Sequence, residues 1–183
     1  MRQILFVQGG GKDVHDQWDN TLVESLRREL GAGYEIRYPR MPNEADPKFG
    51  EWRAAVESEI AALDGGAIVV GHSIGGTVLI NALAERTHGV HLGAIILLAA
   101  PFVGEGGWES DDISLHADLG ARLPAGVPVS LYHGEKDETA PISHVRLYAA
   151  AIPLARVRRL AGRDHQLHDD LANVAGDIRG LER

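Results

Sequence analysis

Short apolar runs alternate along this chain with longer segments in which apolar residues recur every three or four positions. This alternation is typical of strands connected by helices and predicts a mostly parallel β-sheet. Several of the runs are unbroken, as expected for strands that are buried on both faces. The six runs that we expect to form strands are Gln3–Val7, Tyr34–Tyr38, Ala67–Val70, Ala94–Ala99, Val127–Tyr132 and Ala155–Leu160.

Four apolar stripes between these runs predict helices that each turn one face toward a core. They are Trp18, Leu22 and Leu26 before Gly31; Trp52, Val56, Ile60 and Leu63 before Gly65; Ile74, Val78 and Ala82 before Gly89; and Leu167, Leu171 and Val174 near the end. We expect these apolar residues, both tryptophans included, to pack in the core. Residues 101–126 show no clear strand and one short candidate helix near 113–123, so we expect a short lid there.

The most informative motif is Gly71-His72-Ser73-Ile74-Gly75, a G-x-S-x-G pattern. It follows an apolar run and opens a predicted helix, which is the strand–turn–helix context that a nucleophilic serine of this type needs. Glycines on both sides avoid collision with the neighbouring strand and helix in so tight a turn. The alternative is an ordinary glycine-rich turn whose serine caps the helix. The context favours Ser73 as a nucleophile.

A serine hydroxyl needs a base to take its proton, and the base needs an acid to orient it. With this motif, the expected chain order is serine, acid, histidine. Asp137 follows the predicted strand 127–132 and is the candidate acid, with Glu135 and Glu138 as nearby alternatives. His165 follows the run 155–160 and precedes the last predicted helix, so we assign it as the general base in preference to His168.

His168 is expected in the first turn of that last helix. With His165 and the neighbouring Asp164, Asp169 and Asp170, it could also suggest a metal site. Acidic residues at a helix start are, however, explained by the helix dipole. We therefore expect neither a metal nor a cofactor at this site.

A glycine-rich segment, Gln8-Gly9-Gly10-Gly11, directly follows the first predicted strand. Its backbone could supply one N–H to a developing oxyanion, with Gly10 the first choice and Gly11 the next. The N–H of Ile74, directly after the nucleophile, would supply the other. The alternative is a flexible turn without a catalytic part. Phosphate-binding and dinucleotide-binding glycine patterns both fail, because Asp13 follows Lys12 and Val14 stands where a glycine is required.

The composition narrows the remaining possibilities. The 183 residues suit a single domain over 1–183, and the absence of cysteine excludes thiol catalysis, disulfides and thiolate metal sites. The formal net charge of −8 disfavours binding to nucleic acid or to an anionic membrane surface. No apolar stretch approaches the ~20 residues that span a bilayer, so we expect a cytoplasmic protein. The sequence carries no indication of the oligomeric state.

Four elements, taken in order, resemble the α/β-hydrolase superfamily over nearly the whole chain. They are the entry loop at Gln8, the elbow around Ser73, the H-G-x-x-D-x-x-x-P loop from His133 to Pro141, and the G-x-x-H-x-L loop from Gly162 to Leu167. The small size, the Tyr38-Pro39 pair and the last of these loops look most like the compact serine hydrolases related to retinoblastoma-binding protein 9.

The resemblance implies an α/β fold with about six parallel strands, helices on both faces and no large cap domain. It implies a triad of Ser73, Asp137 and His165 and a small-molecule acyl substrate, without a cofactor. A small carboxylic ester is the expected substrate; a thioester, an amide or a non-catalytic binding role are the alternatives. Many members carry histidine where this chain has Gln8, which leaves the shape of the oxyanion loop undetermined. Met41, Trp108 and His15 are candidates for lining the pocket, with simple loop packing as the alternative.

Overall fold

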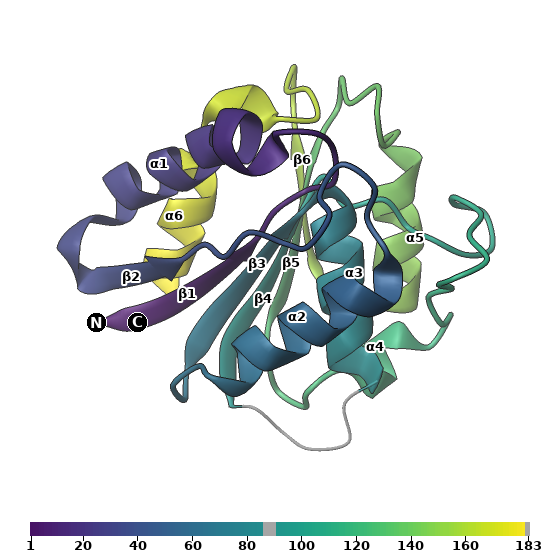
Figure 1. Ribbon diagram of the computed structural model, residues 1–183, viewed down its shortest axis with the longest axis horizontal. Coiled ribbons are helices and arrows are strands. Elements are labelled where there is room, and N and C mark those ends of the chain that lie inside the picture. The colour runs from purple at the N-terminus through teal and green to yellow at the C-terminus, as the bar shows by residue number, and fades with distance from the viewer. Residues whose placement is uncertain (86–90, 182–183) are drawn as a thin grey trace.

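A computed structural model describes residues 1–85 and 91–181 of the chain, and in it the predicted strands form one six-stranded sheet (Figure 1). The strands are β1 (Arg2–Val7), β2 (Tyr34–Arg37), β3 (Ala67–His72), β4 (Leu92–Leu98), β5 (Val129–Gly134) and β6 (Arg156–Leu160). Their order is β2-β1-β3-β4-β5-β6, and every neighbouring pair is parallel. Each boundary lies within two residues of the one that the apolar runs predict.

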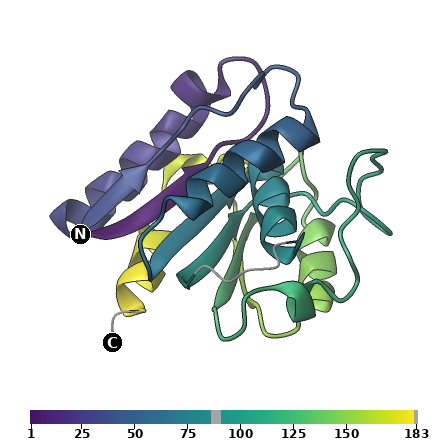
Figure 2. The same ribbon diagram turned by 60° about the horizontal axis from the view of Figure 1, so that its bottom comes forward.

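Helices cover both faces of this sheet, as predicted. The helices α1 (Asp19–Leu30) and α6 (Ala172–Gly180) pack against one face (Figure 1). On the other face lie α2 (Phe49–Ala61), α3 (Ser73–Glu85), α4 (Leu119–Arg122) and α5 (Ser143–Ala151). Figure 2 shows the same three layers from below, with the sheet between the two sets of helices.

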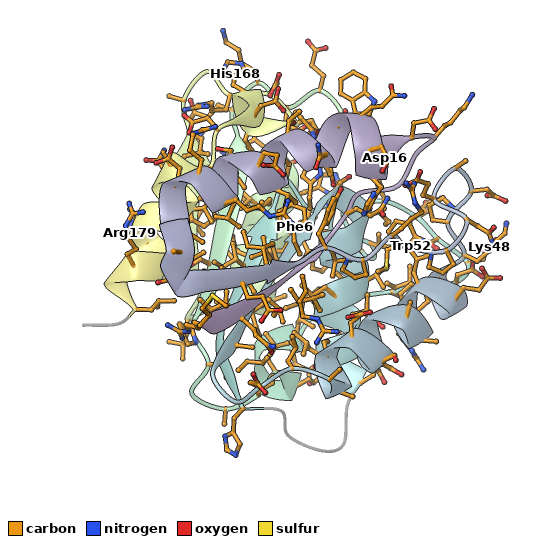
Figure 3. The ribbon with its side chains drawn as sticks, turned by 60° about the vertical axis from the view of Figure 1, so that its left-hand side comes forward. Phe6, Asp16, Lys48, Trp52, His168 and Arg179 are labelled. Carbon is orange, nitrogen blue, oxygen red and sulfur yellow. The ribbon has the colours of Figure 1, made fainter. Side chains whose placement is uncertain are left out.

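The unbroken apolar runs follow from this arrangement, and β1 shows how. Ile4 and Phe6 belong to the core under α1 and α6, whereas Leu5 and Val7 belong to the core under α2, α3 and α5. Successive side chains of a strand point to opposite faces, so a strand covered on both sides needs an apolar residue at every position. Figure 3 shows Phe6 in the interior and His168 at the periphery.

The first helix differs from the prediction at its start. Residues Val14–Trp18 form a π-helical turn, η1, and α1 begins only at Asp19. Trp18 was expected in the core but is 57% exposed. Trp18 is the last residue of η1 and borders a cavity, so the expectation that it packs in the core was wrong.

The last helix was also predicted to begin too early. Leu167 is buried, but it belongs with His168 and Asp169 to a short 3₁₀ turn, η3, in which all three residues have positive φ. The helix α6 starts at Ala172. Placing His168 in the first turn of that helix was therefore wrong. The predicted helix stop at Gly89 lies outside the described residues.

Residues 101–126 form a mostly exposed loop that is anchored by a few buried residues. Ile113 and Leu115 are buried in the core, and the N–H of Leu115 donates to the carbonyl of Val103 at 2.7 Å. The candidate helix there is reduced to the four residues of α4. The helix α5 was not predicted, although Val145 and Tyr148 bury one of its faces. Among the described residues, no helix combines the length and the apolar character needed to cross a membrane.

Candidate active site

The loops that follow β1, β3, β5 and β6 meet at the edge of the sheet where the strands have their carboxyl ends (Figure 1). We call residues 8–11 the glycine loop, 135–141 the acid loop and 161–166 the base loop. Because the strands are parallel, these loops and the turn after β3 converge on one place. The residues assigned to the triad and to the oxyanion hole all lie in these loops or in the turn after β3; they are Ser73, Asp137, His165, Gly10 and Ile74.

Ser73 lies in a strained turn between β3 and α3. Its φ is 51°, in the left-handed region that residues other than glycine rarely adopt. The surrounding glycines make the turn possible. A Cβ on Gly75 would lie 1.9 Å from the backbone oxygen of Gln8, and one on Gly71 would lie 2.5 Å from the Cα of Gly76. Strain of this kind clusters at functional sites and persists only where the surroundings enforce it.

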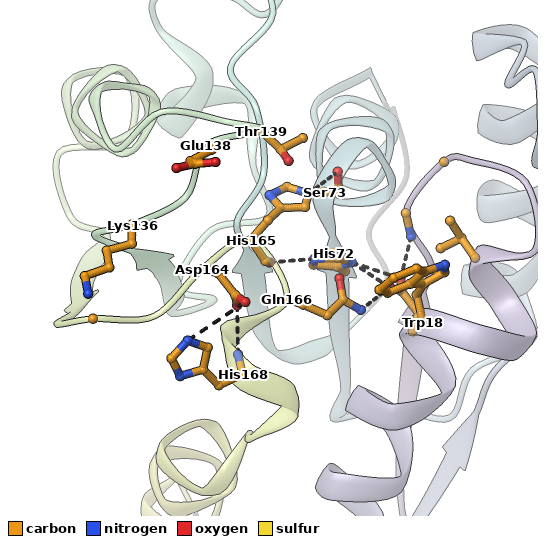
Figure 4. A pocket seen from close by; sticks show the side chains of 15 residues that line it. Trp18, His72, Ser73, Lys136, Glu138, Thr139, Asp164, His165, Gln166 and His168 are labelled. Atoms are coloured by element: carbon orange, nitrogen blue, oxygen red, sulfur yellow. Dashed lines mark hydrogen bonds and ion pairs between the residues drawn. The ribbon is translucent and has the colours of Figure 1, made fainter.

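The structure brings Ser73, His165 and Asp137 into one hydrogen-bonded chain. Nε2 of His165 lies 2.9 Å from Oγ of Ser73 (Figure 4). Nδ1 of the same ring lies 2.8 Å from Oδ2 of Asp137. The imidazole therefore faces the hydroxyl with one nitrogen and the carboxylate with the other, which is the arrangement that a serine–base–acid relay requires.

The surroundings of Asp137 keep its carboxylate ionised. Oδ1 accepts the backbone N–H groups of Thr139 at 2.9 Å and Ala140 at 2.8 Å. Burial by itself raises the pKa of this carboxyl, but hydrogen bonds from His133 and His165 and the charge of His165 outweigh burial. The pKa of Asp137 consequently lies well below its usual range, so the group can stabilise an imidazolium at neutral pH.

The alternative acid and base candidates lie outside this chain of hydrogen bonds. The carboxylate of Glu135 pairs with Arg159 at 3.2 Å, and Glu138 lies at the rim of a cavity. His168 is 3.9 Å from a carboxylate oxygen of Asp164, and its side chain is mostly exposed. Among the residues that the structure describes, no group of three or more histidine, aspartate or glutamate side chains could hold a metal ion.

The acid loop packs backbone against backbone on the base loop and on the end of β6. The N–H of Lys136 donates to the carbonyl of Arg163 in the base loop at 2.9 Å, and that of Glu135 donates to the carbonyl of Leu160, which ends β6, at 3.0 Å. A Cβ on Gly134 would lie only 2.3 Å from the carbonyl oxygen of Arg163. This close approach fixes where His165 stands relative to Asp137.

Of the three glycines in the glycine loop, two have a backbone N–H that is already hydrogen-bonded and one does not. Gly9 donates to Oδ2 of Asp19 at 2.6 Å, and Gly11 donates to the carbonyl of Glu44 at 2.6 Å. Within the described parts of the chain, the N–H of Gly10 has no acceptor, and Gly10 borders the cavity. Of the two donors considered from the sequence, Gly10 is therefore the one that remains available.

Gln8 holds this loop in shape from the inside. Its side chain is buried, accepts the N–H of Met41 at 3.0 Å and donates to Oε2 of Glu44 at 2.6 Å. An amide that both donates and accepts ties the end of β1 to the segment 41–44. The sequence left the effect of Gln8 undetermined, and these contacts supply it.

A cavity of about 660 Å³ opens beside Ser73 (Figure 4). Trp18 and Val14 form an apolar wall of the cavity, while Lys136, Glu138 and Asp164 supply charge. None of the described residues that line the cavity comes from the segment 101–126, so the structure does not support the prediction of a lid there.

The three residues suggested as pocket-lining do not line this cavity. Met41 is 2% exposed and packs in the core, and His15 stacks on Tyr38 with ring centroids 4.1 Å apart. Trp108 lies edge-on to His144. Loop packing, the alternative for each, describes all three.

Asp19 is the residue of this region that the sequence reasoning missed. It is fully buried and contacts His72, Gly9 and Gln166. A signal was present, since Asp19 precedes Leu22, Val23 and Leu26 at the spacing of one helix face. An acidic residue on a buried face requires partners.

A comparison with known protein families finds a match to one of them. The model of the alpha/beta hydrolase family matches residues 4–178. No curated protein sequence matches the chain.

Two solved structures illustrate the likeness in fold. The ydeN gene product from B. subtilis has a TM-score of 0.76 and 18% identity, with 100% of this chain and 99% of that chain covered. The esterase RhEst1 from Rhodococcus sp. ECU1013 has a TM-score of 0.74 and 16% identity, with 98% of this chain and 90% of that chain covered. At such identities the likeness establishes the fold.

Proposed function

The chain belongs to the alpha/beta hydrolase family, and from this membership and the geometry around Ser73 we propose that it is a serine hydrolase that cleaves small carboxylic esters. The observation that carries the proposal is the continuous hydrogen-bonded chain from Asp137 through His165 to Ser73. Subfamily membership with the compact retinoblastoma-binding protein 9 type stays a prediction.

In the first half of the proposed reaction, Nε2 of His165 accepts the hydroxyl proton of Ser73 while Oγ bonds to the ester carbonyl carbon. The carbonyl electron pair moves onto its oxygen and gives a tetrahedral oxyanion. When this intermediate collapses, the C–O bond to the alcohol breaks and the leaving oxygen takes the proton from Nε2. The alcohol departs, and the acyl group remains on Ser73.

In the second half, His165 takes a proton from water while the water oxygen bonds to the acyl carbon. Collapse of the second oxyanion breaks the bond to Oγ, and Ser73 regains its proton from His165. The products are a carboxylic acid and the free enzyme. Asp137 remains ionised throughout and holds the imidazole with Nε2 toward Ser73.

The proposed oxyanion donors are the backbone N–H groups of Ile74 and Gly10. Ile74 is in the first turn of α3, where N–H groups have no partner within the helix. The N–H of Gly10 is uncommitted among the described residues, whereas that of Gly11 is occupied by Glu44. Donors that are already in place when the charge develops stabilise it without reorganisation.

The cavity supports a small substrate with one apolar part. Trp18 and Val14 offer apolar surface next to Ser73, and a volume of about 660 Å³ accepts a short acyl chain together with its alcohol. Lys136 and Glu138 at the rim of the cavity favour a polar group at the end of the substrate opposite its apolar part.

The test is hydrolysis of acetate, butyrate and octanoate esters, with a thioester and an anilide of the preferred acyl group alongside. We expect turnover of the short esters. The Ser73→Ala variant should lose about 10⁴-fold or more in kcat, and Asp137→Asn about 10³- to 10⁴-fold. Ser58→Ala, an exposed site on α2, is the matched control and should keep full activity.

Two results would redirect the proposal. Faster turnover of the thioester or the anilide would change the substrate class and keep the triad. Equal activity in wild type and Ser73→Ala would contradict the nucleophile itself.

A further inference from the structure

Directly behind Ser73 lies a buried pair of titratable side chains that the proposed reaction does not use. Asp19, the first residue of α1, is 0% exposed, and His72, the residue before the nucleophile, is 2% exposed. Nδ1 of His72 lies 2.9 Å from Oδ2 of Asp19. Burying ionisable groups costs free energy even when they are paired and hydrogen-bonded, so the presence of this pair calls for a structural or functional reason.

The hydrogen-bond partners of His72 fix the positions of its protons. Nε2 lies 3.1 Å from the backbone carbonyl oxygen of His165, which can only accept, so Nε2 carries a proton. Nδ1 faces the carboxylate of Asp19, which already accepts the N–H of Gly9 at 2.6 Å and the side-chain amide of Gln166 at 3.0 Å. An ionised carboxylate also only accepts, so Nδ1 carries the second proton and His72 is an imidazolium.

The electrostatic surroundings favour the same protonation state. Burial lowers the pKa of His72, but the charge of Asp19, its hydrogen bond and the His165 carbonyl outweigh burial and leave the pKa above its ordinary value. Burial likewise raises the pKa of Asp19, but the charge of His72 and the hydrogen bonds it receives leave that pKa below its ordinary value. Three other described titratable groups face the pair. They are Asp137, whose charge also favours the imidazolium, the ring of His165, and Tyr38, whose pKa burial and the charge of Asp19 raise.

Two loops that are distant in sequence, the glycine loop and the base loop, meet at this ion pair. Asp19 binds the glycine loop through Gly9 and the base loop through Gln166. His72 binds the base loop through the carbonyl of His165 (Figure 4). The base loop is therefore held from two sides, by the acid loop through Arg163 and by the ion pair through His165 and Gln166.

We propose, on the basis of the proposed serine-hydrolase function, that Asp19 and the imidazolium of His72 are positioning residues that hold the base loop and the glycine loop in place around Ser73. Both residues border the cavity beside Ser73, but the side chain of His72 is only 2% exposed and that of Asp19 is 0% exposed, so they offer a substrate almost no contact area. Their contribution should therefore appear in kcat, through the placement of His165 and Gly10, and not in KM.

The first experiment measures the charge of His72 directly. Ring ¹⁵N and ¹H spectra of the wild type near neutral pH should show protons on both nitrogens of His72. His72→Gln identifies the resonances. A His72 ring with one bare nitrogen near neutral pH would overturn the proposal, because a neutral ring cannot donate to both partners.

The second experiment changes Asp19. Asp19→Asn keeps the shape and removes the charge, so His72 should lose one proton and kcat should fall about tenfold, because charge-assisted hydrogen bonds are about twice as strong as neutral ones. Asp19→Ala also removes the acceptor for Gly9 and Gln166, and kcat should fall about 100-fold. KM should stay within about twofold in both. Asp16 is an exposed aspartate of η1, and Asp16→Asn is the matched control, which should change neither kcat nor KM.

The outcomes separate this proposal from the proposed function. Wild-type turnover that survives Asp19→Asn and Asp19→Ala unchanged would overturn the positioning role and leave the serine hydrolase intact. If the wild type shows no turnover, the proposed function fails, and the ring Nδ1–H signal of His165 becomes the readout. That signal should shift or broaden in Asp19→Ala if the pair positions the base loop, and an unchanged signal would overturn the proposal.

Discussion

A single methyl group added at Gly134 should separate the general base from its serine. Gly134 ends β5, and a Cβ there would lie 2.3 Å from the carbonyl oxygen of Arg163 and 2.4 Å from that of Asp164. Ordinary van der Waals contact begins at 3.4 Å. In Gly134→Ala the base loop must therefore retreat by about 1 Å, or the end of β5 must move away by as much.

The size of the effect follows from the neighbouring residue. His165 comes directly after Asp164, and its Nε2 is 2.9 Å from Oγ of Ser73. A retreat of about 1 Å stretches this contact to about 3.9 Å, beyond hydrogen-bonding distance. Misplacement by about 1 Å costs about 100-fold in rate, and overpacking costs about 1–3 kcal/mol of stability. If the strand moves instead, Asp137 is displaced and the result is similar.

The assay measures kcat/KM on the preferred short ester together with urea unfolding. Gly134→Ala should lose about 100-fold in kcat/KM and should remain folded. Gly176→Ala is the matched control, because its Cβ would meet no atom of the described residues within 4 Å and an alanine stabilises an exposed helix by about 0.5–1 kcal/mol. A folded Gly134→Ala variant with wild-type activity would refute the argument that this backbone contact sets the position of His165.

Three further changes test other parts of the structure. Trp18→Ala should lower kcat/KM for an apolar ester about tenfold with little effect on stability, because Trp18 borders the cavity and is 57% exposed. Kinetics equal to those of the wild type would show that Trp18 does not contact the substrate. Trp52→Ala should destabilise the protein by about 3–5 kcal/mol in urea unfolding, because the side chain is fully buried. Lowering the pH from about 5 toward 3 should reduce the stability of the folded protein. The pKa of Asp137 is lower in the folded protein than in the unfolded chain, where it is about 3.9, so its ionised carboxylate stabilises the fold fully above that pH and progressively less below it. In Asp137→Asn, stability should fall less steeply with pH, and an equally steep fall would contradict the assigned role of Asp137.

The sheet could be predicted from the sequence because burial on both faces leaves a distinct pattern. The run from Ile4 to Val7 is apolar at every position, and the two cores that it serves lie on opposite sides of the sheet. Helix termini were harder. Leu167 has the spacing of a helical stripe, but η3 interrupts the chain before α6, and a periodicity in apolar residues does not report backbone φ.

The candidate site was predictable where local chemistry fixes a residue and not where tertiary contacts do. Ser73 needs glycines beside it, and Asp137 and His165 follow strands, so all three have a local signature. Trp18 is apolar and helical in spacing, yet it lies in the turn before α1 and borders a cavity, which apolar spacing alone does not reveal. Asp19 has the spacing of a buried helix face, but its partners His72 and Gln166 become visible only when the loops meet.

The most direct test of the central claim is covalent labelling with a fluorophosphonate probe, with the adduct located by mass spectrometry. The account predicts one adduct, on Ser73, which forms in the wild type, is absent in Ser73→Ala and is strongly slowed in His165→Ala. A folded wild-type protein that acquires no adduct, or one that is labelled at the same rate without His165, would contradict an activated serine at this site.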